Sequence, residues 1–437
     1  MRPFNRVVAL MVFTASLAYA QDISGDWQGT LEAGAQEIRL LLQITKSDNG
    51  EWRATMLSID QSPDRGVGVP TTSFLLDGSS IRFAIGVIGG SYDGKLSTDG
   101  ASISGMWTQG RPLSLEFRRA TKETAWLDPS PHRTQFIAVE NNIKLEVLDW
   151  GGSGRPLVLL AGLGNTAHVF DKFAPKLSAT YHVYGITRRG FGASSAPSPS
   201  GDTMYSADRL GDDVLAVLDA LKLNRPVLVG HSLGGEELSS VGSRHPERVA
   251  GLIYLDAGYS YAYYDRSRGN LDIDLVELQK KLKKLQPGKG MQDPKTLVHE
   301  LLETNLPGFE RDLQQRQKEL QVMPPALLAQ ASISMPEAAQ AIQTGEQKYT
   351  NIPVPVLAIY AVPHDLGPLP GVDVTARAAF EASDEATTGE QAKAFESGVP
   401  SARVVRLPHA NHYVFFSNEA DVLREMNAFL GSLPLQN

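Results

Sequence analysis

Cysteine is absent from this chain of 437 residues. The absence excludes a thiol nucleophile, a thiolate-bound metal, an iron–sulfur cluster and any disulfide, so stability must come from the core. A sizeable core is available, because hydrophobic residues make up 42% of the chain and charged residues 21%. Basic charge is also scarce: the formal net charge is −8, which argues against nucleic acid as a partner.

A long apolar run is missing after the first twenty residues, so we expect no stable membrane anchor. The start of the chain has the pattern of a secretory signal peptide. Two arginines give a positive beginning, residues 7–17 form a short apolar segment, and Ala-Tyr-Ala at 18–20 is a small-x-small cleavage site. We therefore predict that residues 1–20 are a signal peptide and that the mature protein is secreted or periplasmic.

Residues 21–119 read as an all-β unit, because short strand-like runs alternate with Asp-Gly turns. The spacing of these runs predicts a small antiparallel barrel or sandwich. Gly25-Asp26-Trp27 is similar to the G-x-W signature of lipocalin-like barrels, and we expect the Trp to plug the barrel end rather than to contact a ligand. Prolines and mixed charges mark residues 120–135 as a linker.

From residue 136 onward, strand-like runs alternate with helical stretches, which predicts a largely parallel sheet covered by helices. Residues 136–437 are therefore interpreted as one α/β domain. The alternation stops at about 260–350, where polar stretches contain leucines at helical spacing and several prolines. A long insertion with this periodicity predicts a folded helical lid.

The segment Gly230-His231-Ser232-Leu233-Gly234 has the G-x-S-x-G form of a nucleophile elbow. It follows a predicted strand at 227–229 and precedes a helical run, which is the context that the elbow requires. Such a turn lifts the serine onto a helix N-terminus, where developing negative charge is favoured. Ser232 is therefore the predicted nucleophile.

A serine hydroxyl needs a base to take its proton and a carboxylate to orient that base. In folds with this elbow, the acid and then the histidine follow the serine along the chain. His412 comes just after the last predicted strand and is the favoured base, with His409 as the alternative. His231 should point away from Ser232, and we interpret it as a supporting residue.

Three aspartates are candidates for the acid. Asp365, just after the penultimate strand, is favoured; Asp256, at the end of the preceding strand, is the alternative, and Asp373 is the third choice. An oxyanion hole needs two backbone N–H groups. Leu233 should supply one, and Leu163, in a Gly-rich loop after an earlier strand, should supply the other.

Together these motifs resemble the α/β-hydrolase superfamily, in its esterase and proline-iminopeptidase-like branch, over residues 136–433. The matching segments are Gly162-Leu163-Gly164, residues 189–194, the elbow, residues 245–249 and Asn411-His412. The resemblance implies a triad of Ser232, Asp365 and His412, with Leu163 and Leu233 as oxyanion donors. It also implies a small-molecule ester or amide as substrate, and neither a cofactor nor a metal.

Two flanking positions depart from the family pattern, and they affect loop geometry and substrate more than mechanism. Ala161 stands where many members carry His, and Thr187 where many carry Asp. Epoxide hydrolases and dehalogenases of this fold carry Asp at the nucleophile position, so Ser232 counts against both activities. An aminopeptidase-like activity needs a carboxylate to hold the substrate's amino group, for which Glu236 and the glutamates of the lid are candidates.

Other readings compete with a serine esterase. Residues 162–167 fit the dinucleotide pattern G-x-G-x-x-[GA], and Arg188 and Arg189 could hold a 2′-phosphate, so an NADP oxidoreductase is the rival enzyme. That reading leaves the elbow and His412 without a purpose. His299-Glu300 lacks the second His of a zinc-protease motif. A non-enzymatic reading makes the β unit a binder of a glycan, a lipid or a surface. The sequence does not set the oligomeric state.

Overall fold

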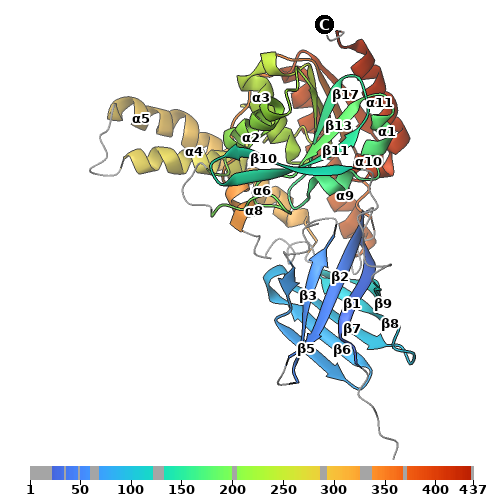
Figure 1. Ribbon diagram of the computed structural model, residues 1–437. Helices are drawn as coiled ribbons and strands as arrows, with labels where there is room; N and C mark the ends of the chain where they lie inside the picture. The colour runs from blue at the N-terminus through green and yellow to red at the C-terminus, as the bar shows by residue number, and fades with distance from the viewer. Residues whose placement is uncertain are drawn as a thin grey trace, which may run out of the picture.

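The computed structural model describes residues 22–33, 36–47, 50–59, 68–121, 132–198, 204–285, 293–324, 337–367 and 372–434. The predicted signal peptide lies outside the described residues, as does most of the predicted linker. The described part of the chain forms two separate β-sheets, one from the N-terminal strands and one from the remainder (Figure 1). The predicted fold class, an antiparallel β unit followed by an α/β unit, is confirmed.

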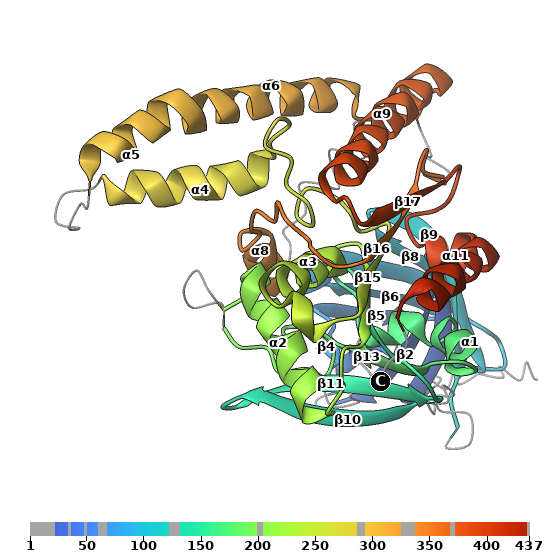
Figure 2. The same cartoon turned by 90° about the horizontal axis from the view of Figure 1, so that it is seen from above.

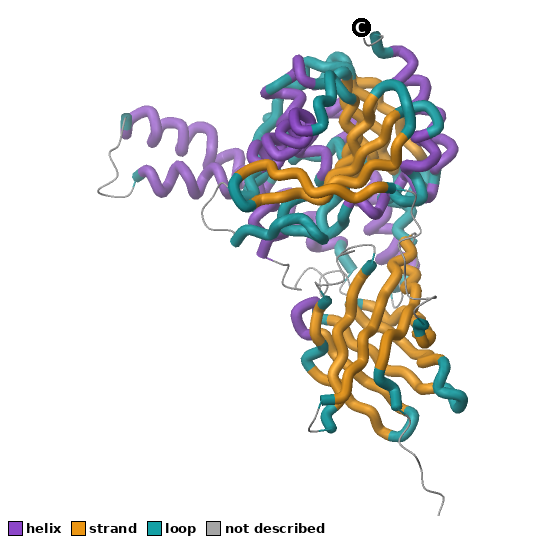
Figure 3. Tube along the Cα trace, in the orientation of Figure 1, coloured by secondary structure: helices purple, strands orange, loops and turns teal. Residues whose placement is uncertain are grey.

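The N-terminal sheet is antiparallel and has nine strands in the order β4-β3-β2-β1-β9-β8-β7-β6-β5. The strands are β1 (Gly25–Ala33), β2 (Gln36–Lys46), β3 (Trp52–Ser58), β4 (Val69–Pro70), β5 (Ser73–Asp77), β6 (Ser80–Ile85), β7 (Gly90–Leu96), β8 (Ser102–Gln109) and β9 (Arg111–Arg119). The N–H of Thr71 donates to Ala54 of β3 at 2.9 Å, and that of Thr72 to Ala84 of β6 at 2.8 Å. These bonds draw the two ends of the sheet together into a half-barrel, the lower body of mostly orange strands in Figure 3, which also carries the short 3-10 helix η1 (Gly86–Ile88).

Large apolar side chains fill the concave side of this sheet. Trp27 is fully buried, its indole N–H donates to the carbonyl of Ile23 at 2.9 Å, and the guanidinium of Arg119 lies 4.5 Å above its ring. Tyr92 is also buried, and its hydroxyl donates to two backbone carbonyls at 3.0 and 3.1 Å. Trp27 therefore packs as a plug, as the sequence predicts, and protein atoms satisfy the polar groups of the Trp27 and Tyr92 side chains.

The second sheet has eight strands in the order β10-β11-β13-β12-β14-β15-β16-β17. Its strands are β10 (Arg133–Glu140), β11 (Ile143–Gly151), β12 (Pro156–Leu160), β13 (His182–Ile186), β14 (Val227–His231), β15 (Gly251–Leu255), β16 (Val356–Ala361) and β17 (Ala402–Leu407). The first two strands are antiparallel, and neighbours from β13 to β17 are parallel. Because β10 pairs with β11 from Arg133 onward, the sheet begins inside the segment predicted as a linker.

Helices cover both faces of this sheet, and each face has its own buried core. One face carries α2 (Ala207–Ala220), α3 (Gly234–Arg244) and α9 (Val374–Gly398), and the other α1 (Ala174–Ser178), α10 (Val414–Ser417) and α11 (Glu419–Ser432). Strands β14 and β15 are buried at every position, as expected for parallel strands between two helical layers. The two cores hold the carboxyl ends of the strands firmly in place, where the loops of the candidate site begin.

Helices occupy the region predicted as a lid. They are α4 (Leu271–Lys284), α5 (Pro294–Glu300), the π-helical turn η4 (Leu301–Asn305), α6 (Leu306–Val322) and α8 (Glu337–Gln343). Helix α4 lies beside the continuous run from α5 to α6, and together they form an arm that projects from the α/β body (Figure 2). In the part of the chain that the structure describes, no helix has both the length and the apolar character needed to cross a bilayer.

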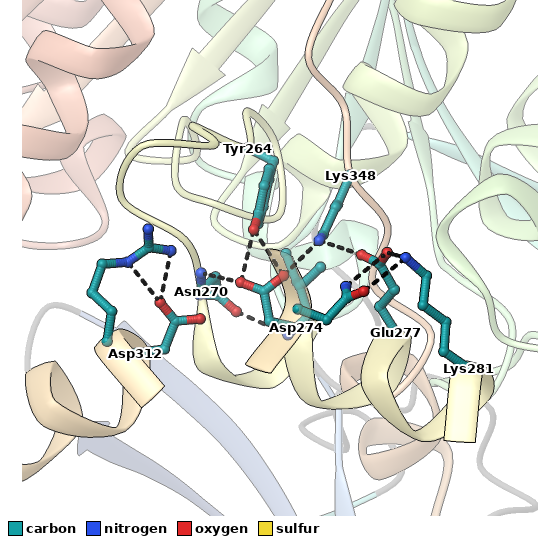
Figure 4. A network of polar contacts seen from close by, with 10 residues as sticks. Tyr264, Asn270, Asp274, Glu277, Lys281, Asp312 and Lys348 are labelled. Atoms are coloured by element: carbon teal, nitrogen blue, oxygen red, sulfur yellow. Dashed lines mark hydrogen bonds and ion pairs between the residues drawn. The ribbon is translucent and has the colours of Figure 1, made fainter. Parts of the chain in front are cut away.

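Charged groups fasten the base of this arm to the segment after α8 (Figure 4). The carboxylate of Asp274 in α4 accepts hydrogen bonds from the Tyr264 hydroxyl at 2.7 and 2.8 Å, and it forms an ion pair with Lys348 at 2.5 Å. Lys348 also pairs with Glu277, one turn further along α4. Burial and the neighbouring carboxylate of Asp274 raise the pKa of Asp312, in α6, to about 6.

The pair of Asp274 and Asp312 should make the attachment of the arm sensitive to pH. Since folding raises the pKa of Asp312, its contribution to stability is fully present below its ordinary value of 3.8 and is lost as the pH rises through about 6. We expect backbone hydrogen exchange in α4 and α6, corrected for the intrinsic rate, to become about threefold faster or more between pH 5 and pH 7. Asp312→Asn should remove most of this change, and an equal change in the variant would contradict the explanation.

Candidate active site

The elbow joins β14 to α3, and Ser232 occupies its apex with a φ of 49°. A positive φ strains a residue that has a side chain, and such strain is common at catalytic turns. Glycines let the turn lie close to the sheet: a Cβ on Gly234 would be 2.6 Å from the carbonyl oxygen of Leu160, and one on Gly235 would be 2.1 Å from that of Ala257. The structure therefore places Ser232 at the carboxyl edge of the sheet and at the N-terminus of α3.

His412 lies in the loop after β17, and its ring is held by Asp256. Nδ1 of His412 donates to Oδ2 of Asp256 at 2.6 Å. Asp256 directly follows β15 and is fully buried, and its Oδ1 accepts from the Tyr259 hydroxyl at 2.9 Å and from the Ala361 N–H at 3.0 Å. Although burial alone would raise it, the hydrogen bonds from His364 and His412 hold the pKa of Asp256 well below its usual range.

Asp365, the acid favoured by the sequence, does not pair with His412. It is exposed, and its carboxylate accepts a hydrogen bond from the N–H of Gly367 at 2.9 Å. Its own N–H donates to the carbonyl of Ala410 at 2.8 Å, so the backbone of this loop is fixed with Asp365 on the outside. We therefore correct the acid partner of His412 from Asp365 to Asp256, which the sequence offers only as the alternative.

The remaining candidates of the sequence have structural positions. Asp373 caps α9, and its carboxylate accepts hydrogen bonds from the N–H groups of Thr375 and Ala376, both at 2.9 Å. His409 is exposed, and its backbone N–H donates to the carbonyl of Pro363 at 2.8 Å. The geometry therefore favours His412 over His409 as the partner of a buried acid.

His231 connects the elbow to the loop of His412. It is buried, its Nε2 lies 3.1 Å from the carbonyl oxygen of His412, and the two ring centres are 4.7 Å apart. Burial, helped by the nearby charge of His412, lowers the pKa of His231 to about 3, so the ring is neutral and donates through Nε2. Because His231 directly precedes Ser232, these contacts tie the loop of His412 to the elbow.

Two backbone N–H groups next to Ser232 are available to a ligand. Among the described residues, neither Leu163 nor Leu233 donates its N–H to a turn, loop or side-chain acceptor. A Cβ on Gly162 would be only 2.9 Å from the Cβ of Ser232, so the loop that contains Leu163 lies directly against the elbow. Free N–H groups beside a nucleophile are what an oxyanion hole requires.

An apolar wall lies next to these donors. The side chains of both leucines pack in one cluster with Ala338 and Ile342 of α8. Tyr261, from the segment after β15, joins the cluster, and its hydroxyl hydrogen-bonds the side chain of Ser232. No motif marks Tyr261 or the α8 residues, because which part of a lid folds back on an elbow is decided by packing rather than by a local pattern.

Two acidic residues near the elbow, Glu236 and Glu346, have raised pKa values. Glu236, in the first turn of α3, is fully buried, and in the described part of the chain neither of its carboxylate oxygens has a hydrogen-bond partner. Burial and the charge of Glu346 raise the pKa of Glu236 well above its usual range. Burial also raises the pKa of Glu346 to about 8. Burial and the charges of Asp256, Glu346 and Glu236 raise the pKa of Tyr261 well above its usual range.

Arg188 and Arg189 are committed to buried carboxylates. Arg188 donates to both oxygens of Glu237 at 2.7 and 2.8 Å, and Arg189 to both oxygens of Asp213 at 2.5 and 2.6 Å. In these bidentate pairs, the arginines already use the paired N–H donors that would bind a 2′-phosphate. The NADP reading of this loop therefore loses its main support.

Among the residues that the structure describes, two groups of side chains have ligand atoms within 4.8 Å of one another: His132, His168 and Asp171, and Asp256, His364 and His412. The ring nitrogens of His168 lie 3.1 Å from Asp171 and 3.3 Å from Glu146, and those of His364 also contact carboxylates. Burial opposes the charge, but these acids raise the pKa of both histidines to about 10. Among the described residues, both groups form networks of hydrogen bonds between histidines and carboxylates.

A family model described as the alpha/beta hydrolase fold matches residues 155–419. The chain is similar to a putative non-heme haloperoxidase of Mycobacterium phage D29, with 32% identity over 115 residues, 26% of this chain and 40% of that protein. It is also similar to epoxide hydrolase A of Mycobacterium tuberculosis, with 33% identity over 124 residues, 28% of this chain and 38% of that protein.

A pimeloyl-[acyl-carrier protein] methyl ester esterase of Edwardsiella ictaluri is 37% identical over 103 residues, 24% of this chain and 36% of that protein. The chain thus spans 36 to 40% of the length of these three relatives. Among solved structures, a putative alpha/beta hydrolase from Nostoc sp. is 19% identical, with a TM-score of 0.45 over 69% of this chain and 98% of that chain. A hydrolase from Pseudomonas aeruginosa is 21% identical, with a TM-score of 0.43 over 69% of this chain and 99% of that chain.

Proposed function

Because this chain belongs to the α/β-hydrolase family, we propose that it is a serine hydrolase that cleaves carboxylic esters through an acyl-enzyme on Ser232. The observation that carries the proposal is the bond of 2.6 Å between Nδ1 of His412 and Oδ2 of the buried Asp256. His231 joins this pair to the elbow, since its ring contacts His412 and its backbone continues into Ser232.

The role of each residue in the reaction follows from which of its atoms already form hydrogen bonds. Nδ1 of His412 is occupied by Asp256, so Nε2 is the nitrogen that takes the proton of Ser232 as its oxygen attacks the acyl carbonyl. The N–H groups of Leu163 and Leu233 stabilise the negative charge that develops on the carbonyl oxygen. His412 then returns the proton to the leaving alcohol, and water releases the acid from Ser232 by the same steps in reverse order.

Labelling with a fluorophosphonate probe tests this proposal directly. We expect wild-type protein to become labelled on Ser232 and to hydrolyse a short-chain p-nitrophenyl ester, and Ser232→Ala to do neither. Ser239→Ala is a matched control, because Ser239 is a buried serine of α3 whose hydroxyl is bonded to Tyr254 at 2.9 Å. Ester turnover in Ser232→Ala equal to that of wild type would overturn the proposal.

A second candidate function is cleavage of an amide beside a free amino group. It is favoured by the buried carboxylate of Glu236, four residues after Ser232, which has no hydrogen-bond partner among the described residues. A substrate ammonium group would supply the positive charge that this carboxylate lacks. On this hypothesis, Glu236→Gln lowers turnover of aminoacyl p-nitroanilides by about tenfold or more and leaves ester turnover unchanged. If Glu236→Gln changed the turnover of both substrates equally, or of neither, ester hydrolysis would remain the only proposed function.

A further inference from the structure

A second histidine, His364, binds the acid that holds His412. His364 lies in the loop after β16, and its Nε2 donates to Oδ2 of Asp256 at 2.8 Å. This is the same oxygen that accepts from Nδ1 of His412 at 2.6 Å. With Tyr259 and Ala361 on the other oxygen, the carboxylate of Asp256 receives four hydrogen bonds and has no lone pair to spare. The two histidines therefore share one oxygen of Asp256.

The far side of His364 is held by another acid. Nδ1 of His364 donates to Oδ2 of Asp384, in α9, at 2.8 Å. Because a carboxylate can only accept, a ring that bonds one carboxylate through each nitrogen carries both protons and is an imidazolium. Burial opposes this charge, but the hydrogen bonds to Asp256 and Asp384 raise the pKa of His364 to about 10. His364 is therefore cationic throughout the range in which serine hydrolases work.

The groups around this imidazolium connect it to His412. Tyr259 places its hydroxyl 3.3 Å from Nε2 of His364, and the ring centre of His412 lies 6.3 Å from that of His364. The loops that carry the two histidines are adjacent, because residue 364 forms a parallel bridge with Ala410. In order, the hydrogen bonds run from Asp384 through His364 and Asp256 to His412, the base of the proposed mechanism.

We propose that His364 is a positioning residue that shares Asp256 with His412 and thereby sets the lower pH limit of activity. As a cation on the common oxygen, His364 withdraws part of the negative charge that Asp256 offers to His412. Asp256 then stabilises an added positive charge on its other partner less strongly, and activity extends to lower pH. Asp384 keeps His364 charged and oriented. The inference rests on the proposed Ser232, His412 and Asp256 mechanism.

The pH profile of kcat/KM for an ester tests this role. His364→Gln keeps an N–H donor for Asp256 but removes the charge, so its acid limb should move to higher pH by about one unit, with a plateau within about threefold of wild type. The double variant His364→Gln/Asp384→Asn replaces an ion pair by a neutral amide pair of equal total charge. Its acid limb should fall between those of wild type and the single variant. His409→Gln, an exposed histidine on the neighbouring loop, should not shift the profile.

The outcomes separate this inference from the proposed function. If Ser232→Ala loses turnover while the acid limb of His364→Gln coincides with that of wild type, the role of His364 is overturned and the triad stands. If Ser232→Ala retains turnover, the triad itself is overturned. Should the His364 variants not fold, ¹⁵N spectra of imidazole-labelled wild-type protein decide the matter. Both ring nitrogens of His364 should stay protonated from pH 5 to pH 8, and a neutral ring at pH 7 would contradict the inference.

Discussion

Replacing Asp256 by Asn is expected to lower kcat for an ester by about 10⁴-fold, whereas Asp365→Asn should leave kcat within about threefold of wild type. Asp256 accepts the Nδ1 proton of His412 at 2.6 Å, and Asn at this position can present an N–H to that nitrogen instead. The ring would then expose the wrong tautomer to Ser232. Asp365 accepts only from the N–H of Gly367 in its own turn, so its amide variant should keep the site intact.

Steady-state kinetics of the two variants at one pH above 7 measure this contrast. KM should change little in either variant, because neither carboxylate lies where the acyl group would bind. Thermal unfolding is the control for folding, since Asp256 is fully buried and receives four hydrogen bonds. A large loss of kcat in Asp365→Asn with little loss in Asp256→Asn would restore the acid that the sequence favours.

The error over the acid has a physical origin. Asp256 directly follows β15 and Asp365 comes shortly after β16, and these strands are parallel neighbours in the sheet. Both residues therefore lie at the same edge, and the order of motifs along the chain cannot choose between them. The choice is made by backbone geometry: Asp256 takes a φ of 47° that leaves it buried under the loop of His412, while His364 occupies the inward position next to Asp365.

Features with a local cause were predictable. The elbow needs glycines where neighbouring backbone comes within about 2 to 3 Å, and Gly234 and Gly235 mark these contacts in the sequence. Trp27 is marked by its G-x-W context and is buried as expected. The helices of the lid follow from leucine spacing, but their arrangement does not. Nothing local indicates that α8 packs on the elbow while α4 and α6 extend as an arm.

Glu236 shows the same limit of prediction from sequence. Its position after the elbow suggests a carboxylate near the pocket. The sequence does not indicate that the carboxylate oxygens lack hydrogen-bond partners among the described residues. Burial raises the pKa of Glu236 well above its ordinary value of 4.5. A group of this kind contributes stability that is fully present below pH 4.5 and is lost as the pH rises through the folded-state value. Glu236 should therefore destabilise the folded protein increasingly at neutral and alkaline pH.

Glu236→Gln should remove this penalty, because the amide has nearly the same shape and stays neutral at every pH. We expect the free energies of unfolding of variant and wild type to be close at pH 5 and to diverge above it by up to about 1.4 kcal/mol per pH unit, with the variant more stable. Urea unfolding from pH 5 to pH 9 measures the divergence, and Glu303→Gln, at an exposed position of the arm, is the matched control. Parallel curves would mean that the carboxylate of Glu236 finds a cation in solution. A variant that gains stability but loses only the turnover of aminoacyl amides would give a different answer. It would show that the destabilising burial of the Glu236 carboxylate serves to bind an ammonium group.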